Sequence, residues 1–188
     1  LRRGDESGLS TGLRDRLRLD DARVRALAAA VRDVAALPDP VGRLLDERTL
    51  PNGVRLQKVS VPFGVIGSIY EARPNVTVDI AALALRSGNA VVLRGGTAAL
   101  SSNAALVAVM RGALGSVGID PEAVQTVDDF GREGADALMQ ARGLVGQVDG
   151  LAALQRLPRH HRVRVHERRH IRDGVSHHVA AAVARLEG

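Results

Sequence analysis

The sequence predicts an α/β protein built on a parallel sheet, and three features point to that class. Short apolar runs bounded by turn-forming residues, as buried strands require, occur in the middle of the chain. Segments of helical length separate these runs. Strands that alternate with helices of this length form βαβ units with right-handed crossovers. An amphipathic segment and a turn signal precede the units, so a helix and a hairpin are expected at the N-terminal side.

The first third of the chain is expected to supply that helix and hairpin. Asp20 and Asp21 can cap a helix that runs to about Leu37 and stops before two prolines. Its apolar residues recur at spacings of three and four, and they are Val24, Leu27, Ala28, Val31 and Val34. The triplet Pro51-Asn52-Gly53 marks a turn between two short extended runs.

The middle of the chain carries the predicted βαβ units. Buried strands are expected at 65–70 and 90–93, and a third at 124–127. Helices are expected over 75–86, 98–114 and 132–142. In parallel sheets of this kind, ligands bind at the carboxyl ends of the strands. The loops 71–75 and 94–102 follow two of the strands and are therefore the candidate site.

Composition excludes several classes of function. The 188 residues contain no cysteine, which excludes disulfides, thiolate metal sites and a cysteine nucleophile within this chain. Aromatic residues make up 2%, too few for base-stacking platforms. No uninterrupted apolar run reaches the roughly 18–20 residues of a membrane span, so no membrane partner is expected. The chain starts Leu1-Arg2-Arg3, without methionine or a signal core, which suggests a fragment; a cytoplasmic location is expected.

The residues after Val145 differ from the rest in charge. Seven arginines fall within 17 residues, and all six histidines lie in the last 29. His166-Glu167-Arg168-Arg169-His170 fits the H-E-x-x-H pattern of zinc proteases, but its neighbouring arginines repel a dication and its flanks alternate like a strand. No metal site is therefore assigned. Adventitious metal binding, nucleic-acid binding through phosphate charge and a solvated tail remain the alternatives for this segment.

Two long motifs in the predicted sheet carry a family resemblance. Residues 62–77 read PFGVIGSIYEARPNVT, and residues 85–96 read LRSGNAVVLRGG, followed by Ser102-Asn103. Together they resemble gamma-glutamyl phosphate reductase, also called glutamate-5-semialdehyde dehydrogenase, of the aldehyde dehydrogenase superfamily. The resemblance covers about two thirds of the chain and less than half of a complete family member. It implies a partial Rossmann-like parallel sheet of that superfamily.

The resemblance also implies a chemistry. The family reduces gamma-glutamyl phosphate to glutamate-5-semialdehyde with NADPH in proline biosynthesis, so this chain is expected to be an oxidoreductase by family. Asn75 is similar to the superfamily asparagine that donates to the oxyanion of the intermediate. Arg94 matches a superfamily position that faces the adenine ribose, and Gly95, Gly96 and Thr97 are expected to approach the cofactor. The family's nucleophilic cysteine has no counterpart here, so the chain alone is expected to be inactive.

Each of these residues also has a purely structural interpretation. Asn75 is a good helix N-cap, and Arg94 can be a solvated residue at a strand end. Glu71 and Arg73 can form a surface ion pair instead of orienting substrate. Ser102 and Asn103 are expected on the surface of a helix. The pairing of 64–70 with 90–94, with Asn75 and Arg94 around one crevice, is the arrangement on which the functional interpretation depends.

The chain is accordingly divided into four parts. An incomplete N-terminal segment covers 1–19, the helix and hairpin 20–60, the partial dinucleotide-binding domain 61–145, and a divergent basic, His-rich tail 146–188. Three hypotheses are carried forward: a partial reductase, a non-catalytic nucleotide-binding or oligomerising module, and a nucleic-acid- or metal-binding protein that acts through residues 156–188. By resemblance the partner is gamma-glutamyl phosphate, and a homo-oligomer is a further candidate.

Overall fold

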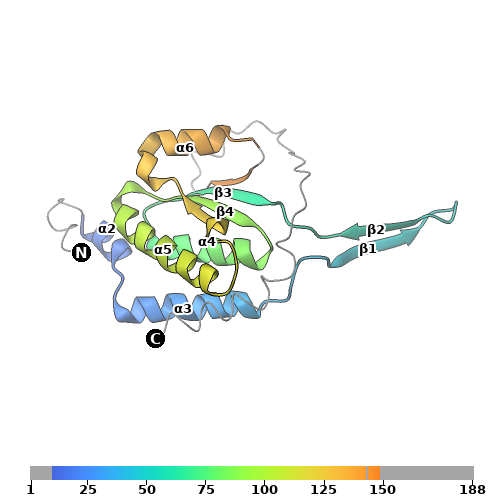
Figure 1. The fold of residues 1–188 in the computed structure, drawn as a ribbon, viewed down its shortest axis with the longest axis horizontal. Coiled ribbons are helices and arrows are strands. Elements are labelled where there is room, and N and C mark those ends of the chain that lie inside the picture. The colour runs from blue at the N-terminus through green and yellow to red at the C-terminus, as the bar shows by residue number, and fades with distance from the viewer. Residues whose placement is uncertain (1–9, 143, 149–188) are drawn as a thin grey trace.

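A four-stranded parallel sheet forms the centre of the protein, seen here in a computed structural model that describes residues 10–142 and 144–148 (Figure 1). Its strands are β3 (Val65–Ile69), β4 (Ala90–Arg94), β5 (Val124–Thr126) and β6 (Val145–Val148). The order across the sheet is β5-β4-β3-β6. β3 pairs in parallel with β4 from Val65 opposite Ala90 to Ile69 opposite Arg94, as the sequence predicted.

Helices cover both faces of this sheet. α4 (Pro74–Arg86) and α5 (Leu100–Ser116) lie on one face, and α6 (Gly131–Gln140) lies on the other (Figure 1). Three short 3₁₀ turns, η1 (Thr97–Ala99), η2 (Pro121–Ala123) and η3 (Asp128–Phe130), connect them. This alternation confirms the expected α/β class with a parallel sheet.

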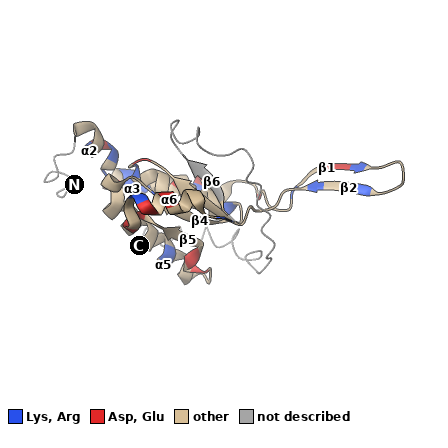
Figure 2. Ribbon diagram, turned by 90° about the horizontal axis from the view of Figure 1, so that it is seen from above, with Lys and Arg blue, Asp and Glu red and all other residues tan. Residues whose placement is uncertain are grey.

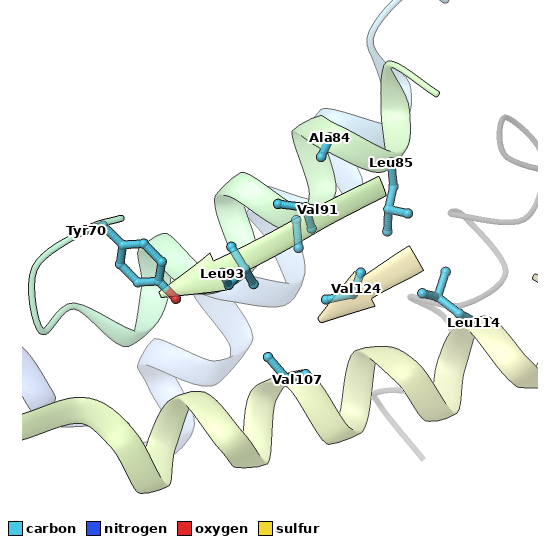
Figure 3. Close-up of a cluster of buried hydrophobic side chains, with 9 residues drawn as sticks. Tyr70, Ala84, Leu85, Val91, Leu93, Val107, Leu114 and Val124 are labelled. Carbon is cyan, nitrogen blue, oxygen red and sulfur yellow. The ribbon is translucent and has the colours of Figure 1, made fainter. Parts of the chain in front are cut away.

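The hydrophobic core lies between the sheet and the two helices on its first face. Val91 and Leu93 of β4 and Val124 of β5 point towards α4 and α5 (Figure 3). They meet the buried helical residues Ala81, Ala84, Leu85, Val107 and Leu114. Because side chains alternate along a strand, the neighbours of Val91 and Leu93 face α6. Gly67 makes room on that second face, since a Cβ there would lie 3.0 Å from Leu138 of α6.

Two helices precede the sheet. α2 (Thr11–Leu17) is capped by Ser10, and α3 (Asp21–Ala36) is capped by Asp20, whose carboxylate accepts from the Arg23 amide at 2.9 Å. α3 packs along α4 and forms a further layer beyond it (Figure 1). The capped helix predicted from Asp20 to about Leu37 is thus confirmed.

The hairpin of β1 (Leu44–Thr49) and β2 (Arg55–Val59) projects away from the rest (Figure 1). Its strands pair antiparallel around the predicted turn, where Gly53 takes a φ of +81° that favours glycine. Every residue of both strands is exposed. β1 carries acidic residues followed by a basic one and β2 carries only basic ones (Figure 2), with Asp46 opposite Lys58 in the pairing.

Three features differ from the expectations. The sheet continues to Val148, because β6 pairs in parallel with β3, so the boundary expected after residue 145 falls inside a strand. Part of the segment 1–19 is helical, since α2 lies there. Lastly, Thr97–Ser116 is long and apolar enough to cross a membrane by length and composition alone. Buried Val107 and Leu114 pack that segment on the sheet, and a core helix of a globular protein meets the same test.

Candidate functional site

The order of the strands indicates a candidate site at the carboxyl ends of the strands, beside β3. β3, β4 and β5 follow one another in one direction, and β6 then lies on the opposite side of β3. The connection therefore reverses between β3 and β6, and ligands of open α/β sheets bind at such a switch point, outside the carboxyl ends of the strands. The sequence interpretation instead placed the crevice between β3 and β4. The loop after β6 lies outside the described residues.

The loops after β3 and β4 touch each other through their backbones. A Cβ at Gly96 would lie 2.5 Å from the Ala72 nitrogen and 2.9 Å from its Cα. No side chain fits in that space without moving one loop, because real Cβ contacts do not come so close. Gly96 therefore fixes the approach of the two candidate loops, which gives it a packing role.

A chain of buried hydrogen bonds connects these loops to the helices. The Tyr70 hydroxyl lies 2.8 Å from the Thr77 hydroxyl, which donates to the Asn103 carbonyl oxygen at 3.0 Å. The Asn103 amide donates to Asp128 at 2.9 Å, and the Gly95 amide donates to the other Asp128 oxygen at 2.6 Å. This polar network holds the ends of β3, β4 and β5 in one arrangement.

Burial sets the acid–base behaviour of the polar network. Tyr70 is 4% exposed. Burial, with a smaller contribution from the nearby Asp128 carboxylate, raises the pKa of Tyr70 to about 12, although its hydrogen bond to Thr77 acts in the opposite direction. Tyr70 therefore stays protonated near neutral pH and acts as a hydrogen-bonding group, not as a base.

The network includes residues that the sequence interpretation missed. Asn103 was expected on a helix surface, and that prediction was wrong, since its side chain is fully buried. Thr77 and Asn103 are polar residues on the core-facing sides of apolar helices, a signal that was present in the sequence. Asp128 follows the carboxyl end of β5, so the rule that selected the other two loops also points to it.

Asn75 occupies the second position of α4, and its side chain is exposed. The N-cap position belongs to Arg73, which makes no side-chain cap, so the N-cap interpretation of Asn75 was wrong; Pro74 at the first helical position moves the cap one residue earlier than expected. Burial raises the pKa of the Asp79 carboxyl, one turn further on, and a hydrogen bond from Asn75 partly lowers it. Asn75 and Asp79 both line a pocket shared with α2 and α3.

Arg94 points away from Asn75. It lies in register with residues of β4 that face α6, and its Nε and one terminal nitrogen donate to the Gly131 carbonyl at 3.3 and 3.2 Å. Its other terminal nitrogen donates to the Gly95 carbonyl at 2.8 Å. Asn75 stands on α4, which covers the opposite face. The strands pair as expected, but Arg94 lies on the α6 side of the sheet and Asn75 on the α4 side, so the expected single crevice around both side chains is not observed.

The remaining candidate residues have separate partners. The Gly95 amide is occupied by Asp128, and Gly95 has no room for a side chain because a Cβ would meet Asn103. Thr97 is exposed and opens a 3₁₀ turn without a side-chain cap. Arg73 and Glu71 form an exposed ion pair at 3.4 Å, the simpler of the two interpretations considered.

Within residues 10–142 and 144–148 no three histidine, cysteine, aspartate or glutamate side chains come together as a metal site. The H-E-x-x-H sequence at 166–170 and the arginine cluster of the tail lie outside the described residues. Their metal- and nucleic-acid-binding alternatives therefore stay predictions.

Comparison with known proteins identifies relatives of this sequence. No protein-family model matches the chain. The gamma-glutamyl phosphate reductases of Leifsonia xyli subsp. xyli and Kineococcus radiotolerans are 61% and 64% identical to it over 145 residues, which cover 77% of this chain and 34% of each relative. The Bifidobacterium adolescentis protein of the same name is 47% identical over 170 residues, or 89% of this chain and 40% of the relative.

Solved structures give the same result for the fold. The gamma-glutamyl phosphate reductase of Thermotoga maritima superposes with a TM-score of 0.75 at 38% identity, over 81% of this chain and 37% of that one. The Saccharomyces cerevisiae enzyme of that name gives a TM-score of 0.69 at 26% identity, over 82% and 40% of the two chains. A Rhodopseudomonas palustris propionaldehyde dehydrogenase, 19% identical with a TM-score of 0.55 over 81% and 41%, shares the fold alone. The chain is therefore a relative of the gamma-glutamyl phosphate reductases and spans about a third of their length.

Proposed function

We propose that this chain is the part of an NADPH-dependent gamma-glutamyl phosphate reductase that holds the cofactor and orients the acyl group of the substrate. The observation that carries the proposal is the 61% identity over 145 residues to a relative of that name. The reaction would be a step of proline biosynthesis in the cytoplasm: a thiolate displaces phosphate from gamma-glutamyl phosphate, and the resulting thioester is reduced to glutamate-5-semialdehyde.

The end of β4 fits a nicotinamide dinucleotide in part. β4 is the second strand counted outward from the switch point, and the residue near the end of that strand meets the adenine ribose in dinucleotide-binding sheets. Arg94 uses three of its five N–H groups on backbone carbonyls, so two are left for a ribose hydroxyl or a 2′-phosphate. An arginine favours the phosphorylated cofactor, NADPH. When bound, the nicotinamide would supply the hydride.

The first turn of α4 fits the acyl group. Asn75 lies on the first turn of α4 with an exposed side chain, so its amide N–H groups are available to a developing oxyanion. The positive end of the 13-residue helix α4 favours the same negative charge. Gly95, Gly96 and Thr97 would support the cofactor indirectly, since the polar network holds this turn in place.

The missing component is a nucleophile. The sequence contains no cysteine, so the acyl transfer needs a thiolate from outside these residues. We expect this chain alone to give no reductase turnover. An exposed hairpin with unpaired strand edges would suit contact with a second copy, in agreement with the expected homo-oligomer.

A chimera tests the function directly. The matched stretch of this chain would replace the corresponding third of the Leifsonia xyli relative, which restores the remainder of the enzyme. We expect NADP⁺- and phosphate-dependent oxidation of glutamate-5-semialdehyde, the reverse reaction, at a rate within tenfold of the parent. Asn75→Ala in the chimera should lower kcat by roughly 100-fold or more, whereas Arg111→Ala, at an exposed ion pair on α5, should not. A folded chimera without turnover would contradict the proposal.

The alternative is a non-catalytic nucleotide-binding module, which the absence of cysteine favours. The two candidates separate on the same chimera, because a module that has lost its catalytic geometry would bind NADPH without restoring turnover. NADPH binding to the intact chain, followed by nucleotide fluorescence, should weaken in Arg94→Ala under both candidates.

A further inference from the structure

A pocket of about 410 Å³ opens between α2, α3 and the first turn of α4. It lies on the α4 side of the sheet, away from Arg94 and its partner Gly131. Its lining combines charged and apolar residues: Asp15, Arg16, Arg18, Leu19, Arg23, Ala26, Leu27, Ala30, Arg73, Pro74, Asn75 and Asp79. We call it the arginine pocket. Its size lies within the range of pockets that hold small molecules.

The charge of the arginine pocket favours an anion. Four arginines face two aspartates around it, while alanines and leucines supply an apolar wall. The uncapped N-terminus of α4 adds a further positive potential from the same side. A ligand here would carry at least one negative group and a short aliphatic part.

Two of the four arginines serve the fold. Arg23 donates to the Asp15 carboxylate at 2.9 Å, to the Arg18 carbonyl at 3.1 Å and to the Asp15 carbonyl, and these bonds clamp α2 onto α3. Arg18 pairs with Asp20 at 2.9 Å. These contacts leave Arg16 and Arg73 as the cations for a ligand.

Arg16 and Arg73 converge on a single carboxylate. Their guanidinium nitrogens lie 3.9 and 3.4 Å from the same Glu71 oxygen, and their side chains are 57% and 51% exposed. Glu71 therefore shows that a carboxylate can be held between one guanidinium from α2 and another from the loop before α4. Because both contacts are long and exposed, a ligand carboxylate can compete for these guanidiniums at small cost.

Asp79 supplies the opposite charge deeper in the arginine pocket. Its carboxylate lies one turn after Asn75 on α4 and is partly buried. A carboxylate that loses water on burial is stabilised by an ammonium group. A ligand with a carboxylate and an ammonium on one carbon, as in an α-amino acid, therefore matches the charges of this wall.

We propose that the arginine pocket binds the amino-acid end of the substrate, with the α-carboxylate at Arg16 and Arg73, the α-ammonium at Asp79 and the acyl carbon beside Asn75. This inference rests on the proposed function. It makes Arg16, Arg73 and Asp79 the specificity-determining residues, and it gives α2, which lines the same pocket as the first turn of α4, a role in substrate binding.

The test is a titration of the isotope-labelled 188-residue chain followed by amide chemical shifts. L-Glutamine is the first probe, because it keeps the α-amino acid group and replaces the acyl phosphate by a neutral amide. The second and third probes are 5-amino-5-oxopentanoate, which lacks the ammonium, and 4-aminobutanamide, which lacks the carboxylate. We expect L-glutamine to shift amides of the arginine pocket, and each truncated probe to bind at least tenfold more weakly, as the loss of one charge-assisted hydrogen bond predicts.

Variants assign the two ends of the ligand. Arg73→Ala and Arg16→Ala should each lower the affinity for L-glutamine by about tenfold. Neither should lower the affinity for 4-aminobutanamide, which has no carboxylate. Asp79→Asn should lower the affinity for L-glutamine but not for 5-amino-5-oxopentanoate, which has no ammonium group. Arg111→Ala, an exposed arginine paired with Glu122, is the matched control and should change nothing. Dispersed amide spectra verify that each variant is folded.

Several outcomes would overturn the inference. Equal affinity for all three probes, an equal effect of Arg111→Ala, or saturation of the same amides by inorganic phosphate would each identify a non-specific anion site. If NADPH binds and the chimera turns over while L-glutamine leaves the arginine pocket unshifted, this inference fails and the proposed function stands. If L-glutamine binds as expected but the folded chimera is inactive, the proposed function fails.

Discussion

The strands of the sheet and the strands of the hairpin differ in sequence and in what covers them: β3 and β4 are almost entirely apolar, whereas β1 and β2 mix leucine and valine with charged residues. Val91 and Leu93 of β4 are 1% and 0% exposed, whereas Leu56 and Val59 of β2 are 44% and 42% exposed. Both regions form backbone ladders, although the hairpin ladder has a register shift between Leu44 and Asp46 that the β3–β4 ladder lacks. The difference is that helices lie on both faces of the sheet, while no described residue covers either face of the hairpin. In this chain, therefore, a segment can pair as a β-strand without being buried.

Different interactions stabilise the two regions. The sheet depends on buried apolar area and on the polar network, which hold it without a partner. The hairpin depends on its turn, its backbone ladder and cross-strand contacts such as Arg55 with Glu47 at 2.8 Å. Two-stranded hairpins are at best marginally stable alone in water, so the hairpin is expected to be the first part to lose structure.

The largest expected difference between the two regions is in the free energy of unfolding lost when one leucine in each is replaced by alanine. Leu93→Ala should lower the free energy of unfolding by about 2–5 kcal/mol, because it leaves a cavity in a fully buried site. Leu56→Ala should change it by less than about 0.5 kcal/mol. Urea denaturation measures both. Equal losses would mean that the hairpin is packed against something in solution, and would break the comparison.

The pH dependence should have opposite signs in the two regions. Tyr70 is the single tyrosine, so tyrosinate absorbance reports it alone and should titrate at about pH 12. Because the folded pKa is raised from 10.0, its contribution is complete below about pH 10 and is lost as the pH rises towards 12. Two pKa units correspond to on the order of 2–3 kcal/mol, and Tyr70→Phe should abolish this loss.

In the hairpin, hydrogen bonds from Gln57 and then Arg55 lower the pKa of Glu47. Its contribution is therefore present above the ordinary glutamate pKa and is lost as the pH falls through the lowered one. The cross-strand amide shifts of the hairpin should change in acid while those of the sheet do not.

A Tyr70 titration near pH 10 in the folded chain would show that the polar network is open to water.

Glycine substitutions should give the smallest difference in stability between the two regions. They also separate loss of stability through a steric clash from loss through an unfavourable backbone conformation. Gly96→Ala should lower stability by about 1–3 kcal/mol, because the new Cβ meets the backbone of Ala72. Gly53→Ala should lower it by about 1 kcal/mol through its positive φ alone, since a Cβ there has nothing within 4 Å.

Asparagine tolerates positive φ, so Gly53→Asn should lower stability much less than Gly53→Ala does. Gly96→Asn should lower stability at least as much as Gly96→Ala. Thermal unfolding provides the measurement. Recovery by Gly96→Asn would contradict the close packing of the two candidate loops.

Much of the fold followed from local patterns in the sequence. The cap at Asp20, the turn at Pro51-Asn52-Gly53 and the pairing of 65–69 with 90–94 depend on neighbouring residues or on apolar period, and all three were predicted correctly. Asn103 was misplaced, because a polar residue in a helix is expected to face solvent unless its buried partners are known. Those partners, Thr77 and Asp128, are each 25 or more positions away.

The sequence by itself determined that this is an α/β chain related to gamma-glutamyl phosphate reductases, with candidate chemistry at the carboxyl ends of its strands. Only the tertiary structure decided that the strand order reverses between β3 and β6, that Arg94 and Asn75 lie on opposite sides of the sheet, and that α2, α3 and α4 line one pocket with four arginines. The physical reason is the sequence distance over which each interaction acts. Period and capping act within a few residues, whereas faces and pockets arise from contacts between segments that are distant in sequence.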